Sequence, residues 1–115
     1  MAKRFRALLV ATVLALTTAI AVAVPASAII TPTIEITNLA YHPERLVVET
    51  GALVKVVNND GRRFGEPHSL TSDQGKFDTG VFTTGNRFFR APGRPGVYWY
   101  HCVIHPFMTG RLKVV

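Results

Sequence analysis

Residues 96–115 read GVYWYHCVIHPFMTGRLKVV, and this stretch carries the clearest signals for fold and chemistry in the sequence. Its two ends are rich in β-branched and aromatic residues, which predicts strands over Gly96–Cys102 and Gly110–Val115. A short loop joins them. Because a tight turn can bring the chain back toward the end of the first strand, this loop can present three metal-binding groups at one point. They are the thiolate, imidazole and thioether of Cys102, His105 and Met108.

The chain upstream of this stretch shows the same short, apolar segments separated by turn residues. From Thr33 onward there is no helical periodicity of useful length, and clusters of Gly, Pro, Asn and Asp divide the apolar runs. Seven or eight short strands of this kind predict an all-β, two-sheet sandwich. The further predicted strands are Thr33–Asn38, Arg45–Glu49, Leu53–Asn58, His68–Ser72, Gly80–Phe82 and Arg87–Arg90.

Alternation along these strands also predicts the core. Successive side chains of a strand point to opposite faces of the sheet, so one residue in two faces inward. The residues expected to face inward are Ile34, Ile36, Leu46, Val48, Val54, Val56, Phe88, Tyr98, Tyr100, Leu112 and Val114.

The N-terminus has the features of an export signal. Lys3, Arg4 and Arg6 precede an apolar run from Leu8 to Val24, and the small-x-small sequence Ala26-Ser27-Ala28 follows. Cleavage after Ala28 divides the chain into a signal peptide, residues 1–28, and one mature domain, residues 29–115. A retained membrane anchor is the alternative, although the run of 17 residues is shorter than the roughly 20 that a span needs. We expect an exported protein, located in the periplasm or the cell envelope or outside the cell, with no membrane span after cleavage.

The charge balance argues against nucleic acid as a partner. The formal net charge of +6 falls to +3 when the three basic residues of the signal are removed. The remaining basic residues are scattered and lack the interleaved aromatic residues of a strand-binding groove. A solvated, mildly basic surface is the simpler interpretation.

A single cysteine in an exported chain needs an explanation, because it cannot form an internal disulfide where disulfides persist. Cys102 could be a buried, inert thiol, an intermolecular bridge or a metal thiolate. Its spacing from His105 and Met108 favours the metal thiolate.

A thiolate, two imidazoles and a weak axial thioether together are the ligand set of a blue copper centre. The loop supplies only one of the two imidazoles, so a second histidine is required. His68 follows Glu66-Pro67 at the start of a predicted strand, 34 positions before Cys102, and is the expected fourth ligand. The sequence therefore predicts one type 1 copper ion bound by His68, Cys102, His105 and Met108.

Over nearly the whole mature segment, the chain resembles the cupredoxins, the type 1 blue copper proteins. The ligand spacing Cys102-x-x-His105-x-x-Met108 is similar to that of the amicyanins, whereas plastocyanins and pseudoazurins have longer stretches between His and Met. This resemblance implies a Greek-key sandwich and a copper cofactor. Other motifs that support it are Tyr41-x-Pro43, Val48-x-x-Gly51-x-x-Val54, Phe77-Asp78-x-Gly80 and Met108-x-Gly110-x-Leu112-x-Val114.

Two positions depart from the family pattern. Many relatives have Asn after the first ligand histidine and Ser or Thr after the cysteine, and hydrogen bonds from these residues bridge the two ligand loops. Here the residues are Ser69 and Val103. Because Val103 has no hydroxyl, we expect the bridge to be weaker or rebuilt, with an effect on the copper potential.

Three other residues near the motif are not expected to bind metal. His101 and Trp99 alternate away from the face of Cys102, so His101 is predicted to be a non-ligand and Trp99 a packing residue. His42 lies in a turn and is assigned a surface or packing role.

Four protein ligands leave no open position for a substrate, which favours electron transfer over metal-assisted hydrolysis. We expect a monomeric one-electron carrier rather than an enzyme. Redox partner proteins would dock near His105, Pro106 and Phe107. The alternatives are copper storage or delivery with the same ligands, and an electron-transfer subunit of a larger copper oxidoreductase.

Overall fold

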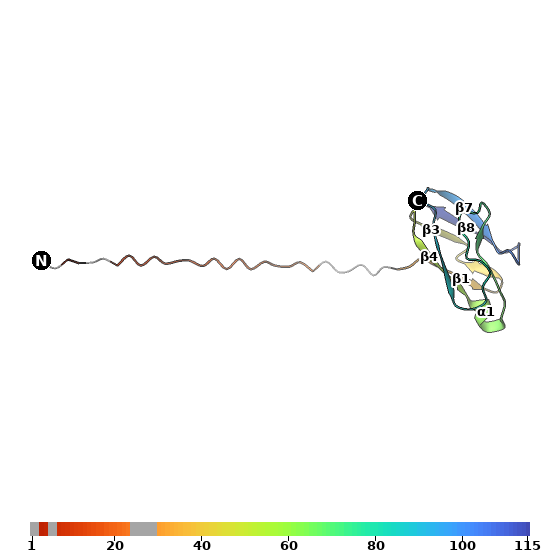
Figure 1. Ribbon diagram of the computed structural model, residues 1–115, viewed down its shortest axis with the longest axis horizontal. Helices are drawn as coiled ribbons and strands as arrows, with labels where there is room; N and C mark the ends of the chain where they lie inside the picture. The colour runs from red at the N-terminus through yellow and green to blue at the C-terminus, as the bar shows by residue number, and fades with distance from the viewer. Residues whose placement is uncertain (1–2, 5–6, 24–29) are drawn as a thin grey trace.

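The computed structural model describes residues 3–4, 7–23 and 30–115, and the folded part begins near Thr33 (Figure 1). Two four-stranded sheets are formed within these residues. The first sheet has the order β2 (Ala40–His42), β1 (Thr33–Thr37), β4 (Leu53–Asn58) and β6 (Asn86–Arg90). The second has the order β3 (Arg45–Val48), β8 (Thr109–Val114), β7 (Gly96–His101) and β5 (Thr71–Ser72).

Both sheets are mixed. In the first sheet β1 runs parallel to β4, and in the second β3 runs parallel to β8, whereas the other pairs are antiparallel. The antiparallel pair β7 and β8 flanks the ligand loop and sets His101 opposite Thr109. The predicted all-β, two-sheet sandwich is confirmed, and the second sheet carries both ends of the loop that contains Cys102.

The core lies between the two sheets and contains most of the residues predicted to face inward. Leu46 is only partly buried and packs against the edge of this core. The prediction for Phe88 is wrong: its side chain is 51% exposed, and the neighbouring Phe89 is 5% exposed. The register explains the difference, because Phe89 pairs with the buried Val54 and stacks on Phe77 at a ring-centroid distance of 4.5 Å.

Two of the predicted strands are shorter than expected or are replaced by isolated bridges. The segment predicted over His68–Ser72 is a strand only at β5, and Gly80–Phe82 is not a strand. The two segments still meet, because the backbone N–H groups of His68 and Phe82 each donate to the other's carbonyl, at 3.1 and 2.9 Å. This bridge holds His68 in the sandwich.

Two elements were not predicted from sequence, the three-residue strand β2 and a short helix α1 (Asn59–Phe64), whose Asn, Asp and Gly residues are typical of a turn. Asn58 caps the start of the helix, and the Asn58 side chain accepts a hydrogen bond from the Gly61 N–H at 2.8 Å. Gly65 ends it in the left-handed conformation, with φ 71°. Gly61 itself lies against the backbone of Thr83, where a β-carbon would overlap the carbonyl oxygen. The helix therefore fits closely into the fold.

Residues 7–23 form neither helix nor strand, and their large apolar side chains are exposed. The predicted cleavage site after Ala28 lies outside the residues that the structure describes. Among the described residues, no helix has the length and hydropathy needed to span a membrane.

Candidate metal centre

Three of the four predicted ligands come together at one end of the sandwich. The Sγ atom of Cys102 and one ring nitrogen each of His68 and His105 lie within 4.8 Å of one another. Cys102 and His68 are fully buried, and the side chain of His105 is 18% exposed. In the described part of the chain, this is the one group of His, Cys and acidic side chains close enough to hold a metal ion.

The distances suit an ion placed between these atoms. Sγ of Cys102 lies 3.9 Å from Nδ1 of His68 and 3.8 Å from Nδ1 of His105. Bonds of about 2.1 Å to nitrogen and about 2.3 Å to sulfur, as in zinc sites, place two ligands about 3.8 Å apart when the angle at the metal is about 120°. The donor atoms, one thiolate and two imidazoles in a trigonal array, are those of a blue copper centre.

Met108 belongs to the same loop and completes the predicted set. Its side chain is 2% exposed. The Met108 N–H donates to the His105 carbonyl at 2.8 Å, and its own carbonyl accepts from the Cys102 N–H at 3.1 Å. These two bonds close the loop on itself, so Cys102, His105 and Met108 are held together by backbone contacts that do not depend on a metal.

A buried carboxylate orients His68. Its Nε2 lies 2.9 Å from Oδ2 of Asp60, and both side chains are almost completely buried. An ionised carboxylate can only accept a hydrogen bond, so the proton of a neutral His68 is placed on Nε2. Nδ1, which faces Cys102, then has a free lone pair. Such carboxylate–histidine pairs fix the ring orientation of metal-binding histidines.

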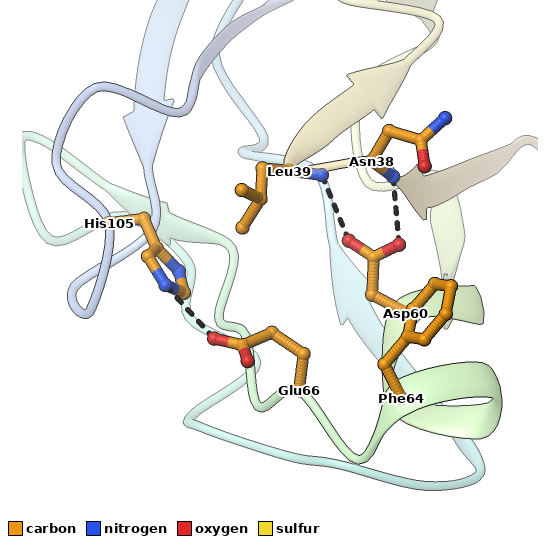
Figure 2. A pocket seen from close by; sticks show the side chains of 6 residues that line it. All are labelled: Asn38, Leu39, Asp60, Phe64, Glu66 and His105. Carbon is orange, nitrogen blue, oxygen red and sulfur yellow. Dashed lines mark hydrogen bonds and ion pairs between the residues drawn. The ribbon is translucent and has the colours of Figure 1, made fainter.

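The backbone keeps Asp60 ionised. Burial would raise the pKa of this carboxyl, but hydrogen bonds from the Leu39 and Asn38 N–H groups and from His68 outweigh burial. As a result the pKa of Asp60 lies below its ordinary value. The two backbone bonds are 2.9 and 2.8 Å long, and Figure 2 shows them at the turn before β2.

His105 is oriented in a similar way by a second carboxylate. Its Nε2 lies 3.1 Å from Oε1 of Glu66, which is 42% exposed (Figure 2). The rings of His68 and His105 are 5.0 Å apart between centroids. Both histidines therefore have Nδ1 toward Cys102 and Nε2 on a carboxylate.

Ser69 rebuilds the bridge between the ligand loops that the departures at Ser69 and Val103 had put in question. The Ser69 hydroxyl accepts from the Val103 N–H at 3.0 Å, and the Ser69 N–H points at Cys102 Sγ at 3.4 Å. The hydroxyl in turn donates to Thr71, whose own hydroxyl donates to Asp78. The bridge uses the backbone of Val103, so the missing hydroxyl there is not needed.

Tyr41 forms a hydrogen bond to the same segment. Its hydroxyl donates to the Ser69 carbonyl at 2.6 Å. Burial, with smaller contributions from Cys102 and Tyr100, raises the pKa of Tyr41 far above its ordinary value. The hydroxyl therefore keeps its proton and remains a donor.

The residues predicted not to bind metal lie outside the site. His101 points away from Cys102 and pairs with Asp73 at the surface. His42 is exposed, and its Nε2 lies 3.2 Å from the Thr37 carbonyl. Trp99 is half-exposed rather than packed in the core, with the Arg111 guanidinium 5.8 Å from the centre of its ring.

Sequence reasoning missed Asp60 and Glu66. Asp60 stands in an Asn-Asn-Asp-Gly run that has the composition of an ordinary turn, and Glu66 is one of several scattered acidic residues. Their role depends on how α1 packs against β1 and where the chain continues after it, which no local pattern encodes.

The chain belongs to the cupredoxin-like domain family, whose model matches residues 7–114. Among solved structures, it is similar to several forms of amicyanin. An oxidised methionine-to-leucine variant of amicyanin aligns with a TM-score of 0.64 and 22% identity, covering 74% of this chain and 82% of that one. A reduced tryptophan-to-tyrosine variant aligns with a TM-score of 0.61 and 25% identity, covering 72% of this chain and 80% of that one. A methionine-to-alanine variant in its Cu(I) form aligns with a TM-score of 0.63 and 24% identity, covering 74% of this chain and 82% of that one.

These comparisons agree with the resemblance drawn from the ligand loop. Comparison with curated proteins found no match. Within the cupredoxin fold, His68, Cys102 and His105 are arranged as in a copper site, and Met108 is buried in the same loop.

Proposed function

We propose that this chain is a small exported electron carrier that binds one type 1 copper ion through His68, Cys102, His105 and Met108. Copper bound at this place supplies a one-electron Cu(II)/Cu(I) couple. The observation that carries the proposal is the convergence of Cys102 Sγ with Nδ1 of both histidines, at 3.9 and 3.8 Å.

The protein groups around the site favour a carrier because they hold the donor atoms in fixed positions. His68 is held by Asp60, the Cys102 thiolate receives the Ser69 N–H, and the loop is closed by its own backbone bonds. A preorganised site changes its geometry little when the charge of the metal changes, so the reorganisation energy of electron transfer is low. Hydrogen bonds and burial around the ligands also tune the potential.

His105 offers the route for electrons to the surface. It is the most exposed of the candidate ligands. Phe107 is 69% exposed and its ring lies 5.8 Å from the His105 ring, and Ile104 is also exposed. Redox proteins form small, short-lived interfaces. We propose that partners dock on this loop, near His105, Pro106 and Phe107, and that the carrier is a monomer.

Export rests on the sequence of the N-terminus. We propose a signal peptide over residues 1–28 and a mature cupredoxin domain over residues 29–115. N-terminal sequencing of the secreted protein tests the boundary, and Ile29 is the expected first residue. Cleavage at the other small-x-small sequence, Ala21-Val22-Ala23, would contradict this boundary, and an uncleaved N-terminus would contradict the signal peptide.

Voltammetry of the copper-loaded domain tests the proposed function. We expect one reversible one-electron wave with fast electron exchange. Tight copper binding without a reversible wave would contradict a carrier and favour storage or delivery. Turnover of a small-molecule substrate by the isolated chain would contradict the assignment as a non-enzyme.

A further inference from the structure

The contact between His105 and Glu66 joins the two ligand segments across the site. Glu66 directly follows Gly65, which ends α1, and it precedes His68 by two residues, whereas His105 belongs to the loop between β7 and β8. Oε1 of Glu66 lies 3.1 Å from Nε2 of His105, and in Figure 2 the two side chains point at each other from separate segments. A carboxylate beside one ligand thus reaches the other ligand.

The backbone of Glu66 is anchored, so its carboxylate is presented from a fixed base. The Asn58 side-chain amide donates to the Glu66 carbonyl at 2.9 Å. The same amide donates to the Phe82 carbonyl at 3.0 Å, beside the bridge that holds His68. Asn58 is fully buried.

His105 has open space beside it. A cavity of about 310 Å³ separates α1 from the ligand loop and is bordered by Asn38, Leu39, Asp60, Phe64, Glu66 and His105 (Figure 2). Side-chain packing therefore does not confine the imidazole on this side. The buried His68 is held by packing and by Asp60, whereas His105 depends more on its single carboxylate partner.

We propose that Glu66 is a positioning residue for His105. By accepting the Nε2–H it keeps the proton of the neutral ring on Nε2, so Nδ1 faces Cys102 with a free lone pair. Its negative charge also lies close to the metal site. A nearby negative charge stabilises the more positive oxidised state, so Glu66 lowers the reduction potential. This second part rests on the proposed function.

The first experiment uses the metal-free protein and needs no copper. Nitrogen-15 NMR of the His105 imidazole, at about pH 8 where a free imidazole is neutral, reports which ring nitrogen carries the proton. We expect the Nε2–H tautomer in the wild type and a shift toward the Nδ1–H tautomer in Glu66→Ala. Glu66→Gln should restore the wild-type tautomer, because the amide oxygen still accepts a hydrogen bond. Equal tautomer populations in wild type and Glu66→Ala would overturn the positioning role.

The second experiment measures the reduction potential of the copper-loaded proteins. Glu66→Gln removes the charge and keeps the size, so we expect a higher potential than in the wild type. Glu49→Gln is the matched control, because Glu49 is exposed at the end of β3 that lies away from the ligand loop, and it should leave the potential unchanged. Equal potentials in both variants would overturn the electrostatic role. If the chain binds no copper, the proposed function fails, while the NMR result still decides whether Glu66 positions His105.

Discussion

Each of the two histidines in the site has one ring nitrogen facing Cys102 and the other on a carboxylate. The two carboxylates differ in environment. Asp60 is buried and accepts two backbone N–H groups in addition to His68, whereas Glu66 is partly exposed. A buried, fully paired carboxylate is costly to alter, because any change leaves a donor without an acceptor.

Asp60→Asn tests this at the buried pair. The NH₂ group of the amide replaces one carboxylate oxygen and then faces a hydrogen-bond donor, either a backbone N–H or the His68 ring. We expect the metal-free protein to lose about 1–3 kcal/mol of unfolding free energy in denaturant titrations. The control is Asp73→Asn, whose carboxylate pairs with His101 at the surface and should cost about 1 kcal/mol or less. Equal losses in the two variants would contradict the role assigned to Asp60.

The hydroxyl of Ser69 links the two segments that carry the candidate ligands. Ser69→Ala leaves the Val103 N–H without its acceptor and unlinks the two ligand segments. We expect a loss of about 0.5–1.5 kcal/mol in stability together with weaker copper binding. The control is Ser72→Ala, which removes only a local bond from the Gln74 N–H and should leave copper affinity unchanged. Unchanged copper affinity in Ser69→Ala would show that the bridge is dispensable.

At the scale of elements, the long strands were predictable because runs of β-branched and aromatic residues lie between turn residues. β4 and β7 are of this kind and were predicted within one residue of their limits. The helix α1 was missed because four of its six residues are polar and a fifth is Gly61, so nothing in the local sequence distinguishes them from a turn. It is stabilised by its caps and by close packing against Thr83, which are tertiary features.

Two adjacent phenylalanines made the register of β6 ambiguous. Alternation permits either one to face inward, and the pairing of Phe89 with Val54 decides it. Phe89→Ala should therefore cost about 3–5 kcal/mol, because it opens a cavity beside Phe77. Phe88→Ala, at an exposed position one residue away, should cost about 1 kcal/mol or less. Denaturant unfolding of the two variants tests the register. A larger loss of unfolding free energy for Phe88→Ala would mean that Phe88, and not Phe89, faces the core.

The candidate ligands could be predicted from sequence, whereas the residues that orient them could not. Cys102, His105 and Met108 share one loop, so their spacing alone indicated a common site. His68 required the ligand set of a known metal centre. Asp60 and Glu66 could not be predicted, because their partners are brought to them only by the packing of α1 beside the sandwich.

For the molecule as a whole, a domain of this size has a thin margin of stability, and a metal that binds only the folded state adds to it. Free copper at about 100 times its dissociation constant adds about 2.7 kcal/mol. For a domain this small, we expect the melting temperature to rise by about 10 °C or more. The control is Cys102→Ala, which removes the thiolate and should show little of this rise. An equal rise in the variant would mean that copper binds elsewhere.

The central claim is that Cys102 is a copper thiolate in a type 1 site. Titration of the metal-free protein with Cu(II), followed by visible spectroscopy, tests it most directly. The account predicts an intense blue thiolate-to-copper charge-transfer band that saturates at one equivalent of copper and is absent in Cys102→Ser. Copper that binds without this band, or a band that persists in Cys102→Ser, would contradict it.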